Sequence, residues 1–266
     1  MIDLHCHILP GIDDGAPDLE TALEMARIAV ADGIEITACT PHIHRGVYDN
    51  DGAIIKAAMR ALQAELEKAA IPLRLICGAD AHIDGDLVDG LRSGRVASLN
   101  DTAYFLFEPP HHIAPPRMED VVFDIMAAGY WPVLTHPERL TWIEDHYDAI
   151  VRMAGRGVLM QITGGSVEGR FGKRPAYWAE RMLDEGLVHI LATDAHNLRN
   201  RKPTLSPARD LVAERLGEDE AFAMVNTRPA AIIANAPPEP VVSRAPLKAK
   251  ARKRSRAPVL SWLGLG

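Results

Sequence analysis

The sequence is poor in cysteine and has no long apolar run. Its 266 residues include only three cysteines, an odd and sparse set, so a disulfide framework is not expected and a reducing, cytoplasmic location is favoured. No segment approaches the roughly 20 uncharged apolar residues that a membrane-spanning helix needs. Asp3, His5 and His7 interrupt the first apolar residues, which argues against an N-terminal secretory signal.

Acidic residues outnumber basic residues in most of the chain. The sequence has 29 Lys and Arg against 36 Asp and Glu, a net charge of -7. Residues 236–266 contain seven basic residues and one acidic residue, a net charge of +6, which leaves -13 for residues 1–235. An acidic body of this kind disfavours a nucleic-acid partner.

Residues 236–266 differ from the rest of the chain in composition. They are rich in proline, alanine and basic residues, which predicts a disordered C-terminal tail that follows one domain over residues 1–235. Trp262, Leu263 and Leu265 lie beyond the basic residues. Basic charge with a few apolar anchors predicts peripheral contact with an anionic membrane, or docking on a membrane-bound kinase. A solvated extension without a role is the alternative.

Apolar segments rich in β-branched residues alternate with longer helical patterns. Strands are predicted at Ile2 to His5, Ile34 to Thr40, Leu73 to Cys77, Ala103 to Glu108, Trp131 to Thr135, Val158 to Ile162 and Val188 to Thr193. Helices are predicted at Asp18 to Ala31, Asp51 to Ala69, Met118 to Ala128, Asp145 to Gly155 and Ala176 to Glu185. Seven such units predict an α/β protein with a parallel sheet closed into a barrel. An open doubly wound sheet is the alternative, although no GxGxxG follows the first strand.

Polar side chains with metal-binding capacity recur where the predicted strands end. In barrels of this class the chemistry collects at the C-terminal ends of the strands, so we expect these side chains to converge. They are His5, His7, His42, Asp80, Glu108, His136, Asp194 and His196, joined by Asp14 from the first turn. Imidazoles and carboxylates without thiolates suit Mn, Fe, Zn or Mg, and nine groups exceed the needs of one ion.

The predicted chemistry is hydrolysis of a phosphoester. Adjacent divalent ions can activate a shared water and clamp both the entering and the leaving oxygen of a phosphoryl group. Arg139 and Arg201 follow His136 and His196 closely, and guanidinium groups there are suited to hold phosphate oxygens. For each arginine the alternative is a surface side chain paired with Glu138 or Asp145.

Seven segments, HCHILPGIDDG, TPHIH, GAD, FEPP, HPER, QITGGSVEGRFGK and ATDAHN, carry a family resemblance over Met1 to about Asn235. Their order and spacing resemble the bacterial polymerase-and-histidinol-phosphatase (PHP) superfamily and, more narrowly, the manganese-dependent CpsB-type protein tyrosine phosphatases that regulate capsule and exopolysaccharide export. The resemblance implies a distorted (β/α)7 TIM-like barrel and a phosphotyrosine protein as substrate, in particular a bacterial tyrosine kinase. It also implies a homo-oligomer.

The resemblance further implies three Mn²⁺ ions. One ion would be held by His5, His7, Asp80 and Asp194, a second by Asp80, Glu108 and His136, and a third by Asp14, His42 and His196. A bridging hydroxide would attack phosphotyrosine, while Arg139 and Arg201 bind its phosphate. The narrower family usually has Glu where Asp80 stands, so the shorter carboxylate is expected to alter metal affinity without abolishing activity. His82, which replaces a basic residue of the family, could lend a further ligand.

Several other residues suggest different roles. Cys39 to Arg45 matches the Cys-x5-Arg pattern of thiol-dependent phosphatases, but Pro41 removes a backbone amide that such a loop needs. Asp13 could cap the first helix, Gly164 to Gly172 could form a flexible substrate loop, and His111 and His112 could contact the substrate. His189 is expected in the core. A phosphoesterase for a small metabolite such as histidinol phosphate and a metal-stabilised regulatory module are the alternative functions.

Overall fold

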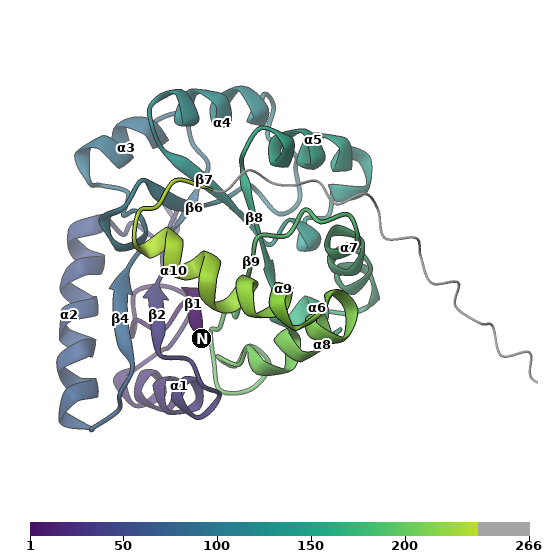
Figure 1. The fold of residues 1–266 in the computed structure, drawn as a ribbon. Coiled ribbons are helices and arrows are strands. Elements are labelled where there is room, and N and C mark those ends of the chain that lie inside the picture. Colours follow the sequence, from purple (N-terminus) through teal and green to yellow (C-terminus); the bar gives the residue numbers. More distant parts are fainter. Residues whose placement is uncertain (239–266) are drawn as a thin grey trace, which may run out of the picture.

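The computed structural model describes residues 1–238, which form parallel strands surrounded by helices (Figure 1). The strands are β1 (Ile2–Cys6), β2 (Ile36–Cys39), β3 (His42–Ile43), β4 (Arg74–Cys77), β5 (Asp80–His82), β6 (Tyr104–Glu108), β7 (Trp131–Thr135), β8 (Leu159–Thr163) and β9 (Ile190–Ala192). The α-helices are α1 (Leu19–Ala31), α2 (Gly52–Lys68), α3 (Leu87–Ser93), α4 (Met118–Ala127), α5 (Ile143–Gly155), α6 (Gly164–Val167), α7 (Lys173–Asp184), α8 (Ser206–Leu216), α9 (Glu218–Phe222) and α10 (Arg228–Ile233).

The strands form two parallel sheets. One has the order β1-β2-β4 and the other the order β3-β5-β6-β7-β8-β9. The chain passes from the first sheet to the second twice, through two-residue breaks after β2 and after β4. The ends of β1 and β9 are also linked, because the His7 amide donates to the Ala195 carbonyl at 2.9 Å and the Asp194 amide donates to the His5 carbonyl at 2.8 Å. All carboxyl ends of the strands therefore face one side of the molecule.

The predicted parallel α/β arrangement is confirmed, with small shifts in the ends of the elements. The short strands β3 and β5 were not predicted, and they follow β2 and β4 beyond the predicted strand ends at Thr40 and Cys77. The five predicted helices are present as α1, α2, α4, α5 and α7, whereas α3 and the helices after β9 were not predicted. Closure of the strands into a barrel stays a prediction.

Both faces of the sheets are covered, as parallel sheets require. Side chains alternate along β6, so Phe105 and Phe107 belong to a large apolar cluster and Tyr104 and Leu106 to a smaller one. The smaller cluster also receives residues from every other strand except the short β3 and β5, namely Leu4, Ala38, Ile76, Val133, Leu159 and Ile190. This continuous packing fixes the strands relative to one another and so fixes the side chains at their ends.

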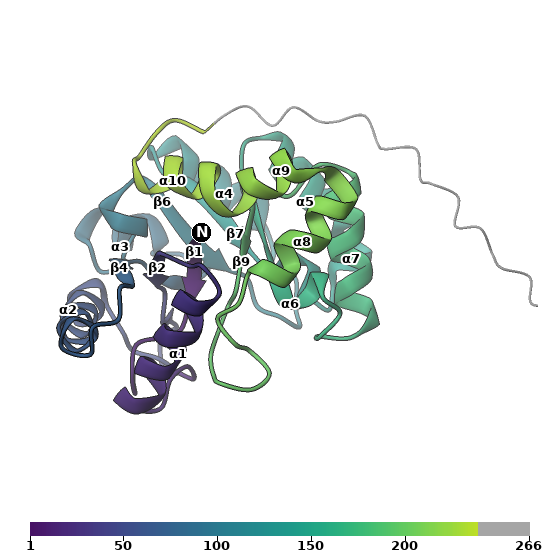
Figure 2. The ribbon, with the colours of Figure 1, turned by 60° about the horizontal axis from the view of Figure 1, so that its bottom comes forward.

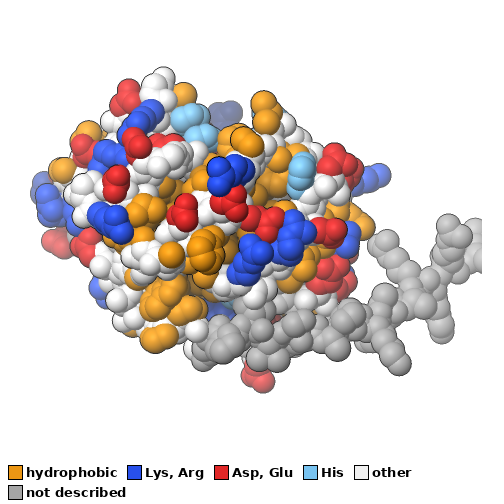
Figure 3. Space-filling model, turned by 90° about the horizontal axis from the view of Figure 1, so that it is seen from above, with side chains coloured by type: hydrophobic (Ala, Val, Ile, Leu, Met, Phe, Trp, Pro, Cys, Tyr) orange, Lys and Arg blue, Asp and Glu red, His pale blue; other side chains and the backbone are white. Residues whose placement is uncertain are grey.

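Acidic and basic side chains are interspersed with hydrophobic ones on the face shown in Figure 3. Among residues 1–238, no helix is long and apolar enough to span a bilayer. The Ala236 amide donates to the Ala231 carbonyl at 3.0 Å, and the Ala236 carbonyl accepts a 2.7 Å bond from the Tyr104 hydroxyl. The predictions for the rest of the tail, including its membrane contact, fall on residues 239–266, outside the described residues.

Candidate metal centre

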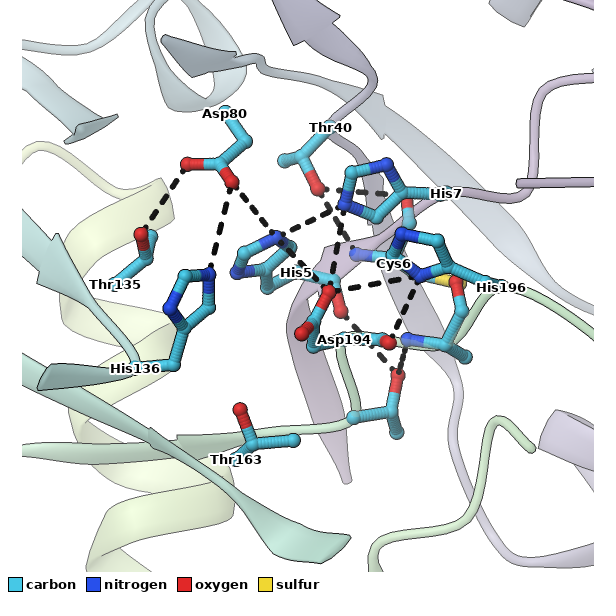
Figure 4. A network of polar contacts seen from close by, with 12 residues as sticks. His5, Cys6, His7, Thr40, Asp80, Thr135, His136, Thr163, Asp194 and His196 are labelled. Carbon is cyan, nitrogen blue, oxygen red and sulfur yellow. Dashed lines mark hydrogen bonds and ion pairs between the residues drawn. The ribbon is translucent and has the colours of Figure 1, made fainter. Parts of the chain in front are cut away.

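The side chains predicted at the strand ends converge on one buried cluster (Figure 4). His5 and His7 extend from the end of β1, and their Nε2 atoms lie 3.1 Å apart. Asp194, which follows β9, places Oδ1 3.4 Å from His5 Nε2 and 3.5 Å from His7 Nε2. Asp80 Oδ2 of β5 lies 3.5 Å from His5 Nε2. Residues almost two hundred positions apart thus share one site.

Two further parts of the cluster adjoin Asp80 and His7. Glu108 lies between His42 and His136, with 3.5 Å from His42 Nδ1 to its Oε2 and 3.4 Å from His136 Nε2 to its Oε1. On the other side, Asp14 Oδ1 is 3.5 Å from His42 Nε2 and 3.3 Å from His196 Nε2. His42 therefore connects the two parts.

Four overlapping groups have potential ligand atoms within 4.8 Å of one another. They are His7, Asp14, His42 and His196; His5, His7 and Asp80; His42, Asp80 and Glu108; and Glu108, His111 and His136. Eight of the nine predicted ligands occur in these groups, and Asp194 lies beside the second of them. His111, predicted only as a residue that contacts substrate, joins the last group.

Unsatisfied polar atoms show that the cluster suits bound cations. Asp80 Oδ2 and His196 Nε2 are buried and have no hydrogen-bond partner among residues 1–238. Buried polar atoms almost always have a partner, and an oxygen and a nitrogen among imidazoles and carboxylates are the ligands that Mn, Fe and Zn accept. The donor set therefore fits divalent metal ions.

The pKa values in the cluster reflect crowded, dehydrated charges. Burial raises the pKa of Glu108 to about 9, and the nearby Asp80 and Asp194 carboxylates act in the same direction. Burial lowers the pKa of His7, but hydrogen bonds to Asp13 and Asp194 outweigh it and raise the pKa to about 10. Burial and the charge of His7 lower the pKa of His196 to about 4. The cluster therefore brings together ionisable groups whose pKa values are shifted in opposite directions, which is characteristic of functional sites.

Outer residues hold the imidazoles in place. His7 Nδ1 lies 2.7 Å from Asp13 Oδ2, and His5 Nδ1 lies 2.8 Å from Gln161 Oε1. Such partners fix the orientation of metal-binding histidines. The expectation that Asp13 caps the first helix is wrong, because Asp18 accepts the Thr21 amide at 2.8 Å and is the cap. The position of Asp13 beside a predicted ligand in a tight turn was the only sequence signal of its role.

Both predicted arginines lie at the edge of the cluster. Arg139 forms an ion pair with Asp194 Oδ2, and Arg201 Nη2 lies 2.6 Å from the same oxygen. Their side chains are 17% and 21% exposed, which leaves part of each guanidinium open to solvent. The alternative pairing of Arg139 with Glu138 is wrong, since the buried Glu138 carboxylate instead accepts bonds from the Thr163 amide at 3.0 Å and the Ser166 hydroxyl at 2.8 Å.

Two of the candidate ligands have an unusual backbone. His136 and Asp194 have φ angles of 34° and 49°, in the left-handed region that residues with a side chain rarely adopt. Each follows the end of a strand, where this turn directs the side chain toward the cluster. Strain of this kind is characteristic of functional sites.

The comparisons with known proteins agree with this geometry. The family model for capsular polysaccharide synthesis, CpsB/CapC, matches residues 1–234. The chain belongs to the CpsB/CapC family. The tyrosine-protein phosphatase YwqE of Bacillus subtilis is 36% identical over 248 residues, which cover 92% of this chain and 98% of YwqE. The tyrosine-protein phosphatase CpsB of Streptococcus agalactiae is 27% identical over 230 residues, which cover 83% of this chain and 93% of CpsB.

A solved structure within the CpsB/CapC family is also similar. It comes from crystal structures of YwqE from Bacillus subtilis and CpsB from Streptococcus pneumoniae, described as unique metal-dependent tyrosine phosphatases. The match has a TM-score of 0.85 at 36% identity and covers 91% of this chain and 99% of the other. The family resemblance found in the sequence is therefore confirmed.

Four other sequence predictions for this CpsB/CapC protein concern residues outside the proposed ligand set. Burial raises the pKa of the Cys39 thiol well above its ordinary value, which opposes the formation of a nucleophilic thiolate. The His82 ring stacks on His44 with centroids 4.0 Å apart, and His82 belongs to none of the four groups. The predicted flexible loop is wrong in its first part, because Gly164–Val167 is the buried helix α6. His189 is buried in the core, as expected.

Proposed function

We propose that this CpsB/CapC protein is a metal-dependent phosphatase that hydrolyses phosphotyrosine in proteins. The observation that carries the proposal is the convergence of imidazoles, carboxylates and two arginines on one cluster with unsatisfied buried atoms. Support also comes from relatives that cover nearly the whole chain and are named tyrosine-protein phosphatases.

The proposed cofactor is Mn²⁺, as three ions, with Fe, Zn or Mg as alternatives. We assign one ion to His5, His7, Asp80 and Asp194, a second to Asp80, Glu108 and His136, and a third to Asp14, His42 and His196. The groups within 4.8 Å overlap with these sets in part, since they also place His7 with the third set, His42 with Asp80 and Glu108, and His111 with Glu108 and His136. When bound, divalent ions polarise phosphate oxygens and lower the pKa of coordinated water.

The protein's own side chains would bind and orient the substrate. The exposed parts of Arg139 and Arg201 would donate hydrogen bonds to the phosphate oxygens of the substrate. Their positive charges would offset the negative charge of this phosphate. Asp13 and Gln161 would keep the imidazoles of His7 and His5 in their orientation throughout.

The proposed setting is the control of capsule or exopolysaccharide synthesis, with a bacterial tyrosine kinase as the phosphoprotein. A cytoplasmic location fits the three cysteines, which are all free thiols. We further propose that the strands form a distorted (β/α)7 barrel, because one apolar cluster receives side chains from seven strands around the sheets. We also propose that the protein forms a homo-oligomer. Light scattering tests this by measuring the molar mass of the protein in solution.

The test compares a phosphotyrosine peptide with histidinol phosphate as substrates of the metal-free protein and of the protein supplied with Mn²⁺. We expect Mn²⁺-dependent hydrolysis of the peptide and little turnover of the metabolite. Circular dichroism after chelation checks that the metal-free chain stays folded. Preferential hydrolysis of histidinol phosphate would assign the protein to small-molecule chemistry. Full turnover without metal would overturn the metal-dependent mechanism.

A further inference from the structure

Two loops meet beside the arginines of the metal centre. One joins α6 to α7, and the other joins β9 to α8 and extends from the carboxyl ends of the strands in Figure 2. Arg170 of the first loop donates from Nη1 to the Asn200 carbonyl of the second at 3.0 Å. The Arg139 guanidinium lies 4.7 Å from the centre of the Phe171 ring. Both loops therefore border the place proposed for the phosphate.

The second loop is held in one conformation by its own hydrogen bonds. Asn197 Oδ1 accepts the amides of Arg199, Asn200 and Arg201 at 2.9, 3.0 and 3.2 Å. The His196 amide donates to the Arg201 carbonyl at 2.9 Å and closes the turn. This turn directs the Arg201 guanidinium toward Asp194, while Arg199 is exposed.

Three exposed cations on these loops or directly after them have no acidic partner in the described part of the chain. Lys173, Arg199 and Lys202 have no carboxylate within 4.0 Å among residues 1–238, and we call these three the basic rim. Two neighbouring arginines do have acidic partners: Arg170 pairs with Glu168 at 2.6 Å, and Arg174 pairs with Glu144 at 3.5 Å. In a body with a net charge of -13, unpaired cations gathered beside a phosphate site create a local positive field.

We propose that the basic rim binds acidic side chains of the protein substrate that lie next to its phosphotyrosine. The inference rests on the proposed function and adds a preference for sequence around the target residue. Carboxylates fit because Arg199 and Lys202 lie on the loop that carries Arg201, and Lys173 begins α7 directly after the loop that borders Arg139. A peptide held at its phosphate must therefore pass these residues. Exposed ion pairs are individually weak, so three together are expected to change kcat/KM about tenfold at low salt.

The experiment uses two phosphotyrosine peptides of equal length, one with glutamates on both sides of the tyrosine and one with glutamines. We expect the full-length Mn²⁺-loaded protein to prefer the glutamate peptide about tenfold in kcat/KM, and the preference to fall as NaCl is raised. The rim variant K173Q/R199Q/K202Q should lose the preference. Its turnover of p-nitrophenyl phosphate should not change, because this substrate has no flanking residues.

A matched control variant removes the same charge elsewhere. Arg60, Lys68 and Arg74 are exposed on α2 and at the start of β4, the strand end opposite the metal centre, so R60Q/K68Q/R74Q should keep the preference. Equal turnover of both peptides by the wild-type protein would contradict the proposed role of the basic rim but would not contradict the proposed function. So would an equal loss of preference in both variants. If p-nitrophenyl phosphate is turned over but neither peptide is hydrolysed, both the proposed function and the proposed role of the basic rim are overturned. Rim-dependent binding to phosphatidylserine vesicles without peptide preference would assign the cations to a membrane instead.

Discussion

Replacing Asp13 by Asn tests whether the outer residues of the cluster control metal affinity. The Asp13 side chain is fully buried and accepts three N–H groups: His7 Nδ1 at 2.7 Å, the His42 amide at 3.1 Å and the Gly15 amide at 2.9 Å. Asparagine is nearly the same size but carries one amino group in place of an oxygen. Either orientation of the amide therefore sets a donor against a donor.

The expected effect has two parts. One buried donor loses its partner, which costs about 1–3 kcal/mol of folding free energy. The bond that orients His7 also weakens, because it loses its acceptor in one orientation of the amide and its charge assistance in the other. Outer-residue changes of this kind lower metal affinity by about 10–100-fold, or roughly 1.4–2.8 kcal/mol. The pKa of His7, which Asp13 helps to raise, should fall in the variant, and this easier loss of the proton offsets part of the decrease in affinity.

Calorimetric titration of the metal-free variant with Mn²⁺ measures the affinity, and phosphotyrosine-peptide turnover at limiting and saturating Mn²⁺ separates binding from catalysis. Activity should recover largely at saturating metal. Asp49→Asn is the control, because Asp49 is exposed and, among residues 1–238, its side chain accepts only the Gly46 amide, at 2.8 Å. Wild-type Mn²⁺ affinity in the folded Asp13 variant would refute the assignment of Asp13 as a partner of a metal ligand.

Three other predictions follow from the same cluster. Cys39→Ser should keep its phosphotyrosine turnover, because the thiol is buried with a raised pKa; loss of activity in a folded variant would restore the thiol mechanism. Asp80→Glu should keep or raise activity at limiting metal while overpacking lowers stability by about 1–3 kcal/mol in thermal unfolding; a large loss of activity would show that the site requires the shorter side chain. Mn²⁺ binding near pH 7.5 should release protons, because His7 and Glu108 have pKa values of about 10 and 9 without metal and must lose their protons to bind it. Affinity should then rise about tenfold per pH unit for each proton released, and binding heats that do not depend on the buffer would contradict this.

Much of the site was predictable because parallel strands place their carboxyl ends on one side. His5, Glu108 and His136 each follow a clear apolar segment, so their convergence required only the strand pattern and the class of fold. The same reasoning located Arg139 and Arg201, which follow predicted ligands closely in sequence.

The remaining features depend on tertiary contacts that a one-dimensional pattern does not contain. The breaks after β2 and β4 leave His42 and Asp80 on a second sheet, whereas the predicted strands ended before these residues, at Thr40 and Cys77. Asp13 was expected to cap the first helix, and only its distance to His7 reveals its role as a partner of a candidate ligand. His111 entered a ligand group because the loop after β6 folds back over Glu108, with 3.5 Å from His111 Nε2 to Glu108 Oε1.

The left-handed backbone of His136 and Asp194 has a consequence for how homologous proteins evolve. Each residue carries a conformational cost of about 1–2 kcal/mol that glycine would remove together with the ligand. In a descendant relieved of its chemistry, this cost would no longer be maintained once the ion pairs and contacts of the two side chains had also been replaced. Glycine at both positions in a homologue would therefore mark a protein that has abandoned catalysis while keeping the scaffold.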